Sequence, residues 1–281
     1  MKIFKGKKKL VSYLNNRPSL LQNKCLGFVP TMGALHEGHL NLIQRAKSEC
    51  ETTIASIFVN PTQFNNINDF KSYPKTLNSD LTKLKTLNCD IVYIPTIKDI
   101  YKHGEKAKEF NFGTLAESME GAFRPGHFNG MATVVEKFFN IIKPTKAFFG
   151  QKDLQQLQIV KHLVKQKNIP IEIISIPTVR ENNGLAKSSR NNLLSKNEKE
   201  EASIIYSCLK FCAKNKKMGI ENLKLHIQNQ FAKQKNIKLE YIEIVNINNM
   251  LSINEFKQEG ENAICIAANI NSVRLIDNII L

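Results

Sequence analysis

Two histidines flanking a glycine, at the start of an expected helix, are the residues of this 281-residue chain best placed to do chemistry. His36 and His39 are three residues apart, so both would lie on one side of the first helical turn. Gly38 has no Cβ atom and would let a ligand approach the backbone. A helix N-terminus also offers unpaired N–H groups and the positive end of the helix dipole. Together these features predict a site for an anion such as a phosphate.

The same residues allow two simpler interpretations. The histidines could bind a metal, but zinc needs more ligands, and His-Glu-Gly-His lacks the spacing of the His-Glu-x-x-His metalloprotease motif. They could also be surface residues at an ordinary helix start. A Walker loop is excluded because the Gly-Lys-Ser/Thr ending is absent. Choosing the anion site over these interpretations therefore requires further ligand-binding residues elsewhere in the chain.

The segments around the histidines alternate between strand and helix patterns. The apolar runs at 26–29 and 52–59 are followed by proline- or glycine-bearing loops, and helical periodicity runs from Leu40 to about Cys50. Other expected strands lie at 90–94, 146–149 and 171–179. Other expected helices lie at 8–15, which ends before Pro18, and at 132–142; one more begins at 79, and another carries Gln155 and Gln156 and ends at about 167. This order predicts an α/β fold with a Rossmann-like, doubly wound parallel sheet.

The sequence pattern changes from Ser195 onward, in a part of the chain joined to the rest near residue 180. Two lysine-rich helical stretches, at about 197–214 and 221–235, precede short strands near 239–245 and 263–267 and a closing segment at 272–280. This part predicts a smaller C-terminal α+β domain with no catalytic cluster of its own. We therefore expect a Rossmann-like domain over 1–180 and a smaller domain over 181–281.

Further polar groups follow expected strands, where open α/β sheets bind ligands. Asn60 and Gln63 come after the strand at 52–59. Gly150-Gln-Lys-Asp153 repeats the strand-glycine-helix turn and adds a lysine, and Ser188-Ser-Arg190 places two hydroxyls beside a cation. Asp80 begins a helix, where a carboxylate could stabilise the helix dipole or bind magnesium.

Composition narrows the classes of protein to consider. The chain is 42% hydrophobic and has no apolar run near 18 residues and no signal peptide, so we expect a cytoplasmic protein without a membrane anchor. Its six cysteines include no Cys-x-x-Cys pair, which predicts reduced thiols. The net charge of +15 would suit nucleic acid, but the lysines are spread along the chain and are not interleaved with aromatic residues. We expect no nucleic-acid partner and an attraction for anionic substrates.

Seven motifs resemble, in order and at matching intervals, those of the pantoate–β-alanine ligase family within the nucleotidylyltransferase superfamily. They lie at 30–39, 57–64, 124–128, 149–153 with Gln155-Gln156, 177–180, 188–191 and 274–278. The resemblance covers nearly the whole chain. It implies an enzyme that joins (R)-pantoate to β-alanine through a pantoyl adenylate, with ATP as co-substrate, Mg²⁺ as cofactor, and AMP and pyrophosphate as further products. It also implies a homodimer whose smaller domain closes as a lid.

The resemblance assigns roles to individual positions. It implies catalysis by His36, His39 and Lys152, with His39 as the acid for the departing pyrophosphate. The residues implied to bind ATP are Met32, Gly33, Ala34, Leu35, His36, Glu37, Gly38, His39, Gly150, Gln151, Lys152, Asp153, Val179, Lys187, Ser188, Ser189 and Arg190. Those implied to bind pantoate or β-alanine are Pro30, Met32, Asn60, Gln63 and Gln156, and Asp80 is the candidate magnesium contact.

This chain departs from the family pattern at two of the quoted places. Lys187 replaces the methionine usual before Ser-Ser-Arg, and Lys75 replaces an arginine. Lys75 keeps the charge but loses the bidentate fork of a guanidinium.

Two other functions make different predictions. Another nucleotidylyltransferase would keep the adenylate as its product, and the paired glutamines and the 124–128 loop speak against it. A basic RNA-binding protein would bind RNA in a salt-sensitive way and be indifferent to His39→Ala.

Overall fold

The computed structural model describes residues 1–17 and 25–281, so Pro18, expected to follow the end of the first helix, lies outside the described residues. The chain forms two compact units. The first comprises Met1–Phe112, Arg124–Gln151 and Ile159–Pro177. The second comprises Gly113–Phe123, Lys152–Gln158 and Thr178–Leu281. The sequence suggested a single division at 180, whereas two internal segments group with the C-terminal part.

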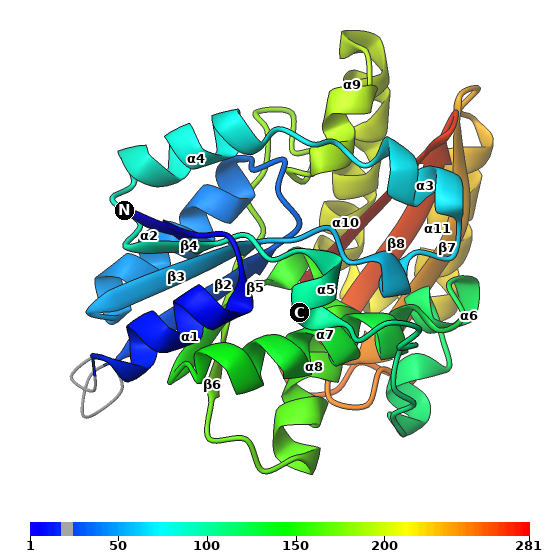
Figure 1. The fold of residues 1–281 in the computed structure, drawn as a ribbon. Helices are drawn as coiled ribbons and strands as arrows, with labels where there is room; N and C mark the ends of the chain where they lie inside the picture. The colour runs from blue at the N-terminus through cyan, green and yellow to red at the C-terminus, as the bar shows by residue number, and fades with distance from the viewer. Residues whose placement is uncertain (18–24) are drawn as a thin grey trace. The chain divides into compact units, whose positions relative to one another are not determined.

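A six-stranded parallel sheet forms the centre of the first unit and confirms the predicted fold class (Figure 1). Its strands, in spatial order, are β1 (Lys2–Phe4), β4 (Ile91–Tyr93), β3 (Thr52–Ile57), β2 (Leu26–Thr31), β5 (Lys146–Gly150) and β6 (Glu172–Ile176). The strand order reverses at β2, which pairs with β3 on one side and β5 on the other. Such a switch point is where open α/β sheets bind ligands at the carboxyl ends of their strands.

Helices cover both faces of this sheet. The longer ones are α1 (Lys7–Asn15), α2 (Glu37–Glu49), α4 (Leu77–Thr86) and α7 (His127–Ile142), while α8 (Leu154–Gln166) starts in the second unit and continues in the first. Figure 1 shows α2 and α4 on one face and α1 and α7 on the other. Adjacent residues of β2 serve both faces, because side chains alternate along a strand. Phe28 contacts the ring of Phe138 in α7 (5.6 Å between centroids), and Val29 belongs to the core cluster that contains Ile43 of α2.

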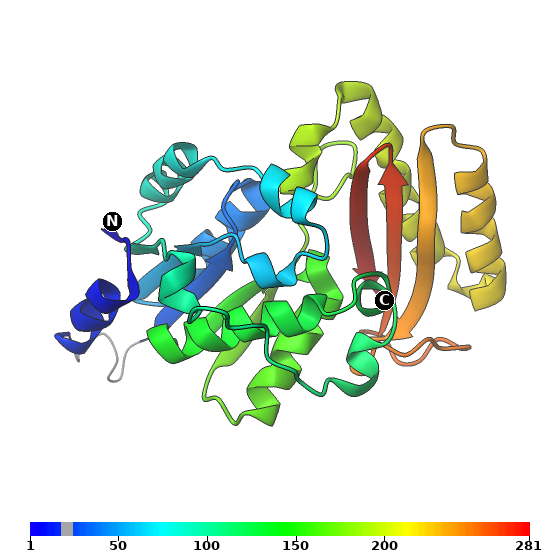
Figure 2. The same cartoon turned by 45° about the vertical axis from the view of Figure 1, so that its right-hand side comes forward.

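The second unit contains a three-stranded antiparallel sheet, with α10 and α11 against one face (Figure 2). Its elements are α9 (Lys196–Ala202), α10 (Ile204–Lys214), α11 (Ile220–Ala232), β7 (Ile237–Asn246), β8 (Asn262–Ile270) and β9 (Val273–Ile280). Alternate residues of β8, including Ile264 and Ile266, belong to the core cluster shared with these helices. The helix expected at 197–214 is broken at Ser203 into α9 and α10.

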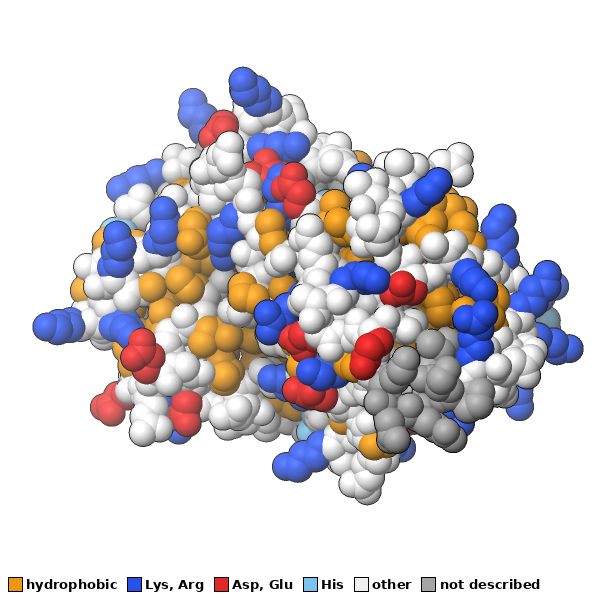
Figure 3. Space-filling model, turned by 90° about the vertical axis from the view of Figure 1, so that its left-hand side faces the viewer, with side chains coloured by type: hydrophobic (Ala, Val, Ile, Leu, Met, Phe, Trp, Pro, Cys, Tyr) orange, Lys and Arg blue, Asp and Glu red, His pale blue; other side chains and the backbone are white. Residues whose placement is uncertain are grey.

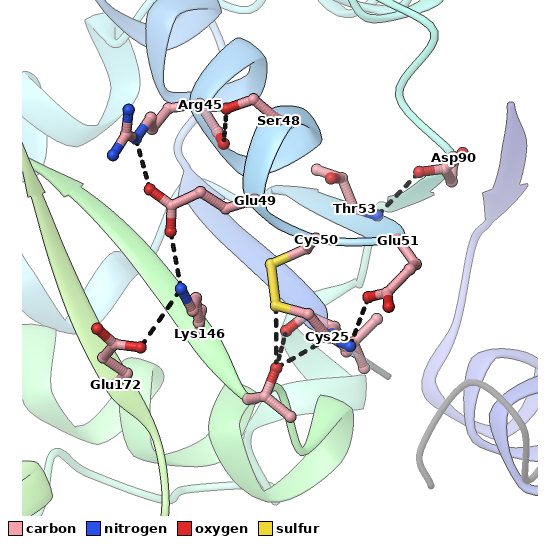
Figure 4. The surroundings of a disulfide bond; sticks show 12 residues. Cys25, Arg45, Ser48, Glu49, Cys50, Glu51, Thr53, Asp90, Lys146 and Glu172 are labelled. Atoms are coloured by element: carbon pink, nitrogen blue, oxygen red, sulfur yellow. Dashed lines mark hydrogen bonds and ion pairs between the residues drawn. A yellow bond between two sulfur atoms is a disulfide. The ribbon is translucent and has the colours of Figure 1, made fainter. Parts of the chain in front are cut away.

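Cys25 and Cys50 form a disulfide, so the prediction of reduced thiols is wrong for this pair (Figure 4). Cys25 precedes β2, and Cys50 lies between α2 and β3. Because Leu26 pairs with Thr52 in the parallel register, the sheet brings the two cysteines together across 25 positions of sequence. No local spacing encodes such a pair. The other four cysteines are buried free thiols.

Lysines and arginines on the face drawn in Figure 3 are spread out, with acidic and apolar side chains among them. This distribution differs from the continuous basic stripe that marks many nucleic-acid-binding surfaces. None of the helices in the described ranges is long and apolar enough to cross a membrane.

Candidate active site

The loop between β2 and α2 turns sharply before it presents the two histidines. Gly33 and Ala34 have φ values of +81° and +51°, in the left-handed region that a non-glycine residue rarely adopts. The hydroxyl of Thr31 accepts a hydrogen bond from the Gly33 amide (3.2 Å) and donates one to the carbonyl of Ser56 (2.6 Å). These contacts tie the start of the loop to the end of β3.

The two histidines form a reciprocal cap at the N-terminus of α2. Nδ1 of His36 accepts a hydrogen bond from the amide of Gly38 (3.1 Å), and Nδ1 of His39 accepts one from the amide of His36 (3.3 Å). Because both Nδ1 atoms are acceptors, this geometry assigns the proton of each neutral imidazole to Nε2. The arrangement therefore makes each Nε2 a hydrogen-bond donor at a helix N-terminus, which suits a phosphate.

Asp80 of α4 fixes the backbone of the histidine loop through hydrogen bonds. Its side chain is only 1% exposed, and its two oxygens accept hydrogen bonds from the amides of Ala34 (3.0 Å) and Leu35 (2.8 Å). The hydroxyl of Thr76 also donates to it (3.1 Å). Asp80 thus sets the loop conformation, which is a different role from a simple helix charge. Its predicted contact with magnesium stays a prediction, and the described residues contain no cluster of three or more His, Cys, Asp or Glu side chains arranged for a metal.

A buried amide network brings three predicted substrate residues together within the first unit. Asn60 is 1% exposed and donates hydrogen bonds to Oε1 of Gln63 (3.0 Å) and to the carbonyl of Gly130 (3.1 Å). Gln63 points its own amide nitrogen at the sulfur of Met32 (3.3 Å). The hydroxyl of Tyr101 donates to Asn60 (2.6 Å), and burial raises the pKa of Tyr101 to about 12, so it stays protonated. Tyr101 is a residue that sequence reasoning missed.

The start of α7 fixes the backbone of Gln63. Nδ1 of His127 lies 2.8 Å from the carbonyl oxygen of Gln63 and donates to it, while Nε2 of His127 accepts from Arg124 (3.2 Å). At Gly130 a Cβ atom would lie only 2.1 Å from the carbonyl oxygen of Thr62, so glycine alone fits. The 124–128 motif is one of the seven that carry the family resemblance, but that resemblance assigns no role to its individual residues. Turn-forming residues up to Gly130 predict a helix that starts only at 132, whereas α7 begins at His127.

A cationic pocket forms within the second unit. Its lining includes Lys152, Ser188, Arg190, Arg274 and Asp277. The backbone hydrogen bond from Lys187 to Val179 (2.9 Å) closes a hairpin that leads directly into Ser188, whose hydroxyl accepts from the amide of Arg190 (3.3 Å). This pocket therefore brings Lys152 together with Ser188 and Arg190, groups that suit an anion, and their proposed role in binding ATP stays a prediction.

The paired glutamines of α8 have different environments. Gln155 is 5% exposed; it accepts a hydrogen bond from the Glu120 amide (3.0 Å) and donates to the carbonyls of Leu115 and Ser118 (both 2.9 Å). Gln156 is half-buried, and its side chain makes no hydrogen bond within the described chain. Gln155 is therefore structural, and Gln156 is the glutamine with capacity to bind a ligand.

The predicted residues fall in both units. In the first are Pro30, Met32, Gly33, Ala34, Leu35, His36, Glu37, Gly38, His39, Asn60, Gln63, Asp80, Gly150 and Gln151. In the second are Lys152, Asp153, Gln156, Val179, Lys187, Ser188, Ser189 and Arg190.

Comparison with known proteins identifies relatives over the full length of the chain. A family model described as pantoate-beta-alanine ligase matches residues 2–280. The chain is 44% identical to a pantothenate synthetase of Cytophaga hutchinsonii, over 92% of this chain and 93% of the relative. It is 42% identical to that of Christiangramia forsetii, over 100% and 99% of the two chains.

Solved structures agree. A pantothenate synthetase from Thermus thermophilus superposes with a TM-score of 0.91 at 33% identity, over 99% of both chains. A pantoate-beta-alanine ligase from Francisella tularensis, complexed with beta-gamma ATP and beta-alanine, gives a TM-score of 0.82 at 40% identity, over 100% of this chain and 97% of that one.

Proposed function

Because the chain belongs to the pantoate-beta-alanine ligase family, we propose that it condenses (R)-pantoate with β-alanine at the expense of ATP. The reaction has two steps. A carboxylate oxygen of pantoate attacks the α-phosphorus of ATP and pyrophosphate departs; the amine of β-alanine then attacks the acyl carbon of the pantoyl adenylate, releasing AMP and forming the amide of pantothenate. ATP is needed because a carboxylate does not acylate an amine in water without a leaving group.

The observation that carries this proposal is the pair of histidines whose Nδ1 atoms accept backbone hydrogen bonds. With the ring proton on Nε2, each imidazole is a directed donor. We assign His39 to the departing pyrophosphate and His36 to the phosphates of bound ATP. Adenylation moves negative charge onto phosphate oxygens, so positioned donors and cations stabilise its transition state more than a protein nucleophile would.

The second unit supplies the complementary charge in this proposal. Lys152, Ser188, Ser189 and Arg190 hold the triphosphate. Lys152 and Arg190 both line the cationic pocket, and this supports their role. Gly150, Asp153, Val179 and Lys187 are assigned to the nucleoside part on the resemblance alone.

Pantoate is assigned to Gln63 and Gln156. The amide of Gln63 is held in place by Asn60 and lies beside Met32, and Gln156 has an amide without a hydrogen-bond partner in the described chain. Pro30 and Met32 form an apolar wall in this assignment. Asn60 is buried and fully engaged, so we give it the role of orienting Gln63.

Magnesium is expected as the partner of the ATP phosphates, where it would neutralise charge on the departing pyrophosphate. The candidate protein contact, Asp80, has both oxygens engaged by loop amides. These contacts fit a positioning carboxylate better than a metal ligand, so we route no step through an Asp80-bound ion. A homodimer and a cytoplasmic location, both expected from the family, complete the proposal.

The deciding experiment follows pyrophosphate release from ATP and Mg²⁺ with pantoate, with and without β-alanine, and identifies the products by mass spectrometry. We expect an enzyme-bound pantoyl adenylate without β-alanine, and pantothenate with AMP when β-alanine is added. A stable adenylate released as the final product would instead indicate an adenylyltransferase. Absence of pantoate-dependent release from folded protein would refute the proposal.

A further inference from the structure

A buried ion pair lies beside the cationic pocket of the second unit. The guanidinium of Arg180 donates two parallel hydrogen bonds to Asp277 of β9, from Nη1 to Oδ2 (2.5 Å) and from Nη2 to Oδ1 (3.0 Å). Asp277 is 4% exposed. The guanidinium also stacks on the ring of Tyr206, 3.7 Å from its centroid, and donates to the carbonyls of Gly184 and Asn278. Arg180 is thus held in one orientation by contacts on several sides.

One arm of this network reaches Lys152. Oδ1 of Asp277 accepts a hydrogen bond from the amide of Asn278 (2.8 Å). The side chain of Asn278 in turn donates to the carbonyl of Lys152 (2.8 Å). The orientation of Asn278, and with it the backbone of Lys152, therefore depends on the position of Asp277.

The other arm reaches the segment 188–190. Arg180 forms an isolated antiparallel bridge with Ala186, inside the hairpin closed by Val179 and Lys187. The carbonyl of Ala186 also accepts from Asn191 (3.0 Å), on the far side of that segment. Moving Arg180 would displace the hairpin from which Ser188 and Arg190 extend.

The charge of Asp277 also requires explanation. Among the described residues that line the pocket, Asp277 is the only acidic one, beside Lys152, Arg190 and Arg274. An isolated carboxylate there would repel a phosphate. Bidentate pairing with Arg180 cancels its charge while leaving its oxygens to organise the backbone. A residue that had only to fill space would not need an acid at this place.

We propose that Arg180 and Asp277 are positioning residues that hold Lys152 and the 188–190 segment in the arrangement that binds the β- and γ-phosphates of ATP, an inference that rests on the proposed function. Neither residue is assigned a contact with the reacting atoms. The inference distinguishes two ligands. ATP depends on the positioned cations, whereas AMP lacks the phosphates that they bind.

The test compares ATP and AMP binding by isothermal titration calorimetry in wild type, Asp277→Asn and Arg180→Lys. The first variant removes the charge that holds Arg180, and the second keeps a cation but loses the bidentate fork and the stacking. We expect each to weaken ATP binding about tenfold and to leave AMP binding within about twofold. If Asp277→Asn does not fold, Arg180→Lys alone carries the test, because it leaves the buried carboxylate a positive partner.

The matched control is Glu243→Gln, which breaks an ion pair of the same unit, with Lys224 (3.0 Å), away from the pocket. It should leave both affinities unchanged. Equal weakening of ATP and AMP, or a loss of stability with unchanged ATP affinity in the folded variants, would overturn the positioning role. Pantoate-dependent pyrophosphate release by wild type tests the proposed function separately: if it is absent while ATP binding shows the expected pattern, the reaction is wrong and the positioning role stands.

Discussion

Two buried carboxylates, one in each unit, organise the loops of the candidate site in different ways. Asp80 accepts hydrogen bonds from the neutral amides of Ala34 and Leu35, whereas Asp277 is paired with a guanidinium. The amides that point at Asp80 cannot also point at a phosphate. The amides of His36 and Gly38 are engaged by the two imidazoles, so in the proposed function the first unit offers an anion the Nε2–H groups of His36 and His39.

In the second unit the buried carboxylate is neutralised by a cation. Arg180 cancels the charge of Asp277, and the cations Lys152, which lies 3.6 Å from Asp153, and Arg190 line the pocket. The difference indicates a division of labour, with directional donors in the first unit and charge in the second.

The largest effects are expected from removing the group that each unit contributes. His39→Ala and Lys152→Ala should each lower pantoate-dependent pyrophosphate release by at least about 100-fold, because each removes transition-state charge stabilisation. His39→Gln keeps an N–H donor close to the position of Nε2 and should retain more activity than His39→Ala. Steady-state assays on variants with native circular dichroism make the measurement. Near-normal rates in folded His39→Ala would show that the imidazole donor is dispensable.

A smaller effect is expected from Asp80→Asn. The amide replaces one acceptor by an NH₂ group that faces a backbone N–H, so we expect a loss of about 2 kcal/mol of unfolding free energy and about a tenfold lower kcat. Urea denaturation and steady-state kinetics measure the two quantities. Asp99→Asn is the matched control, since Asp99 also accepts backbone amides, from Lys7 (3.0 Å) and Thr96 (2.8 Å), but lies outside the histidine loop. It should lose stability without losing kcat.

Magnesium dependence separates the two roles considered for Asp80. If Asp80 only positions the loop, the Mg²⁺ concentration for half-maximal rate should stay within about twofold of wild type in Asp80→Asn. A clear increase in that concentration would make Asp80 a metal contact after all.

Much of the fold was predictable because it depends on local sequence patterns. Apolar runs ending at proline or glycine predicted the strands, and their alternation with helices predicted the parallel sheet. The helix after the histidines was predicted from the periodicity that begins at Leu40, although α2 begins three residues earlier, at Glu37. The short edge strand β1 was missed because three residues next to a lysine run carry too little pattern.

The groups that position the site were not predictable, because long-range contacts define them. Ala34 and Asp80 are 46 positions apart, and Arg180 and Asp277 are 97 apart. Sequence placed Asp80 at a helix start, but only the fold shows that its oxygens face a backbone turn. Tyr101 gave no signal at all, because its role depends on a buried partner, Asn60, from another loop.

The two glutamines of α8 allow a direct comparison between a residue that stabilises the fold and one that is proposed to contact the substrate. Gln156→Ala should raise the KM for pantoate about tenfold and leave the KM for ATP nearly unchanged, because it removes a hydrogen bond to substrate. Gln155→Ala should instead lower the unfolding free energy by about 2 kcal/mol, because it removes three hydrogen bonds to the backbone of Leu115, Ser118 and Glu120. Steady-state kinetics and urea denaturation of both variants test this, and an exchange of the two phenotypes would reverse the assignment.

The smallest kinetic effect is expected at the disulfide, which gives the first unit a covalent link. Cys25 and Cys50 enclose the entire histidine loop within one closed segment of chain, yet neither side chain has a place in the proposed chemistry. Cys25→Ser combined with Cys50→Ser should therefore leave kcat within about twofold, while the chain-entropy model assigns the link about 3.5 kcal/mol of stability.

Thiol counting tests whether that link exists in solution. In the folded protein, burial raises the pKa of Cys89 to about 11 and that of Cys208 to about 12, so these thiols stay protonated and unreactive at pH 8. The count is therefore made in denaturant, which exposes the buried thiols. A thiol reagent should detect four cysteines in denaturant without reductant, and six after reduction. Six without reductant would remove the covalent link, and the histidine loop would then owe its conformation to Asp80 and the β2–β3 pairing alone.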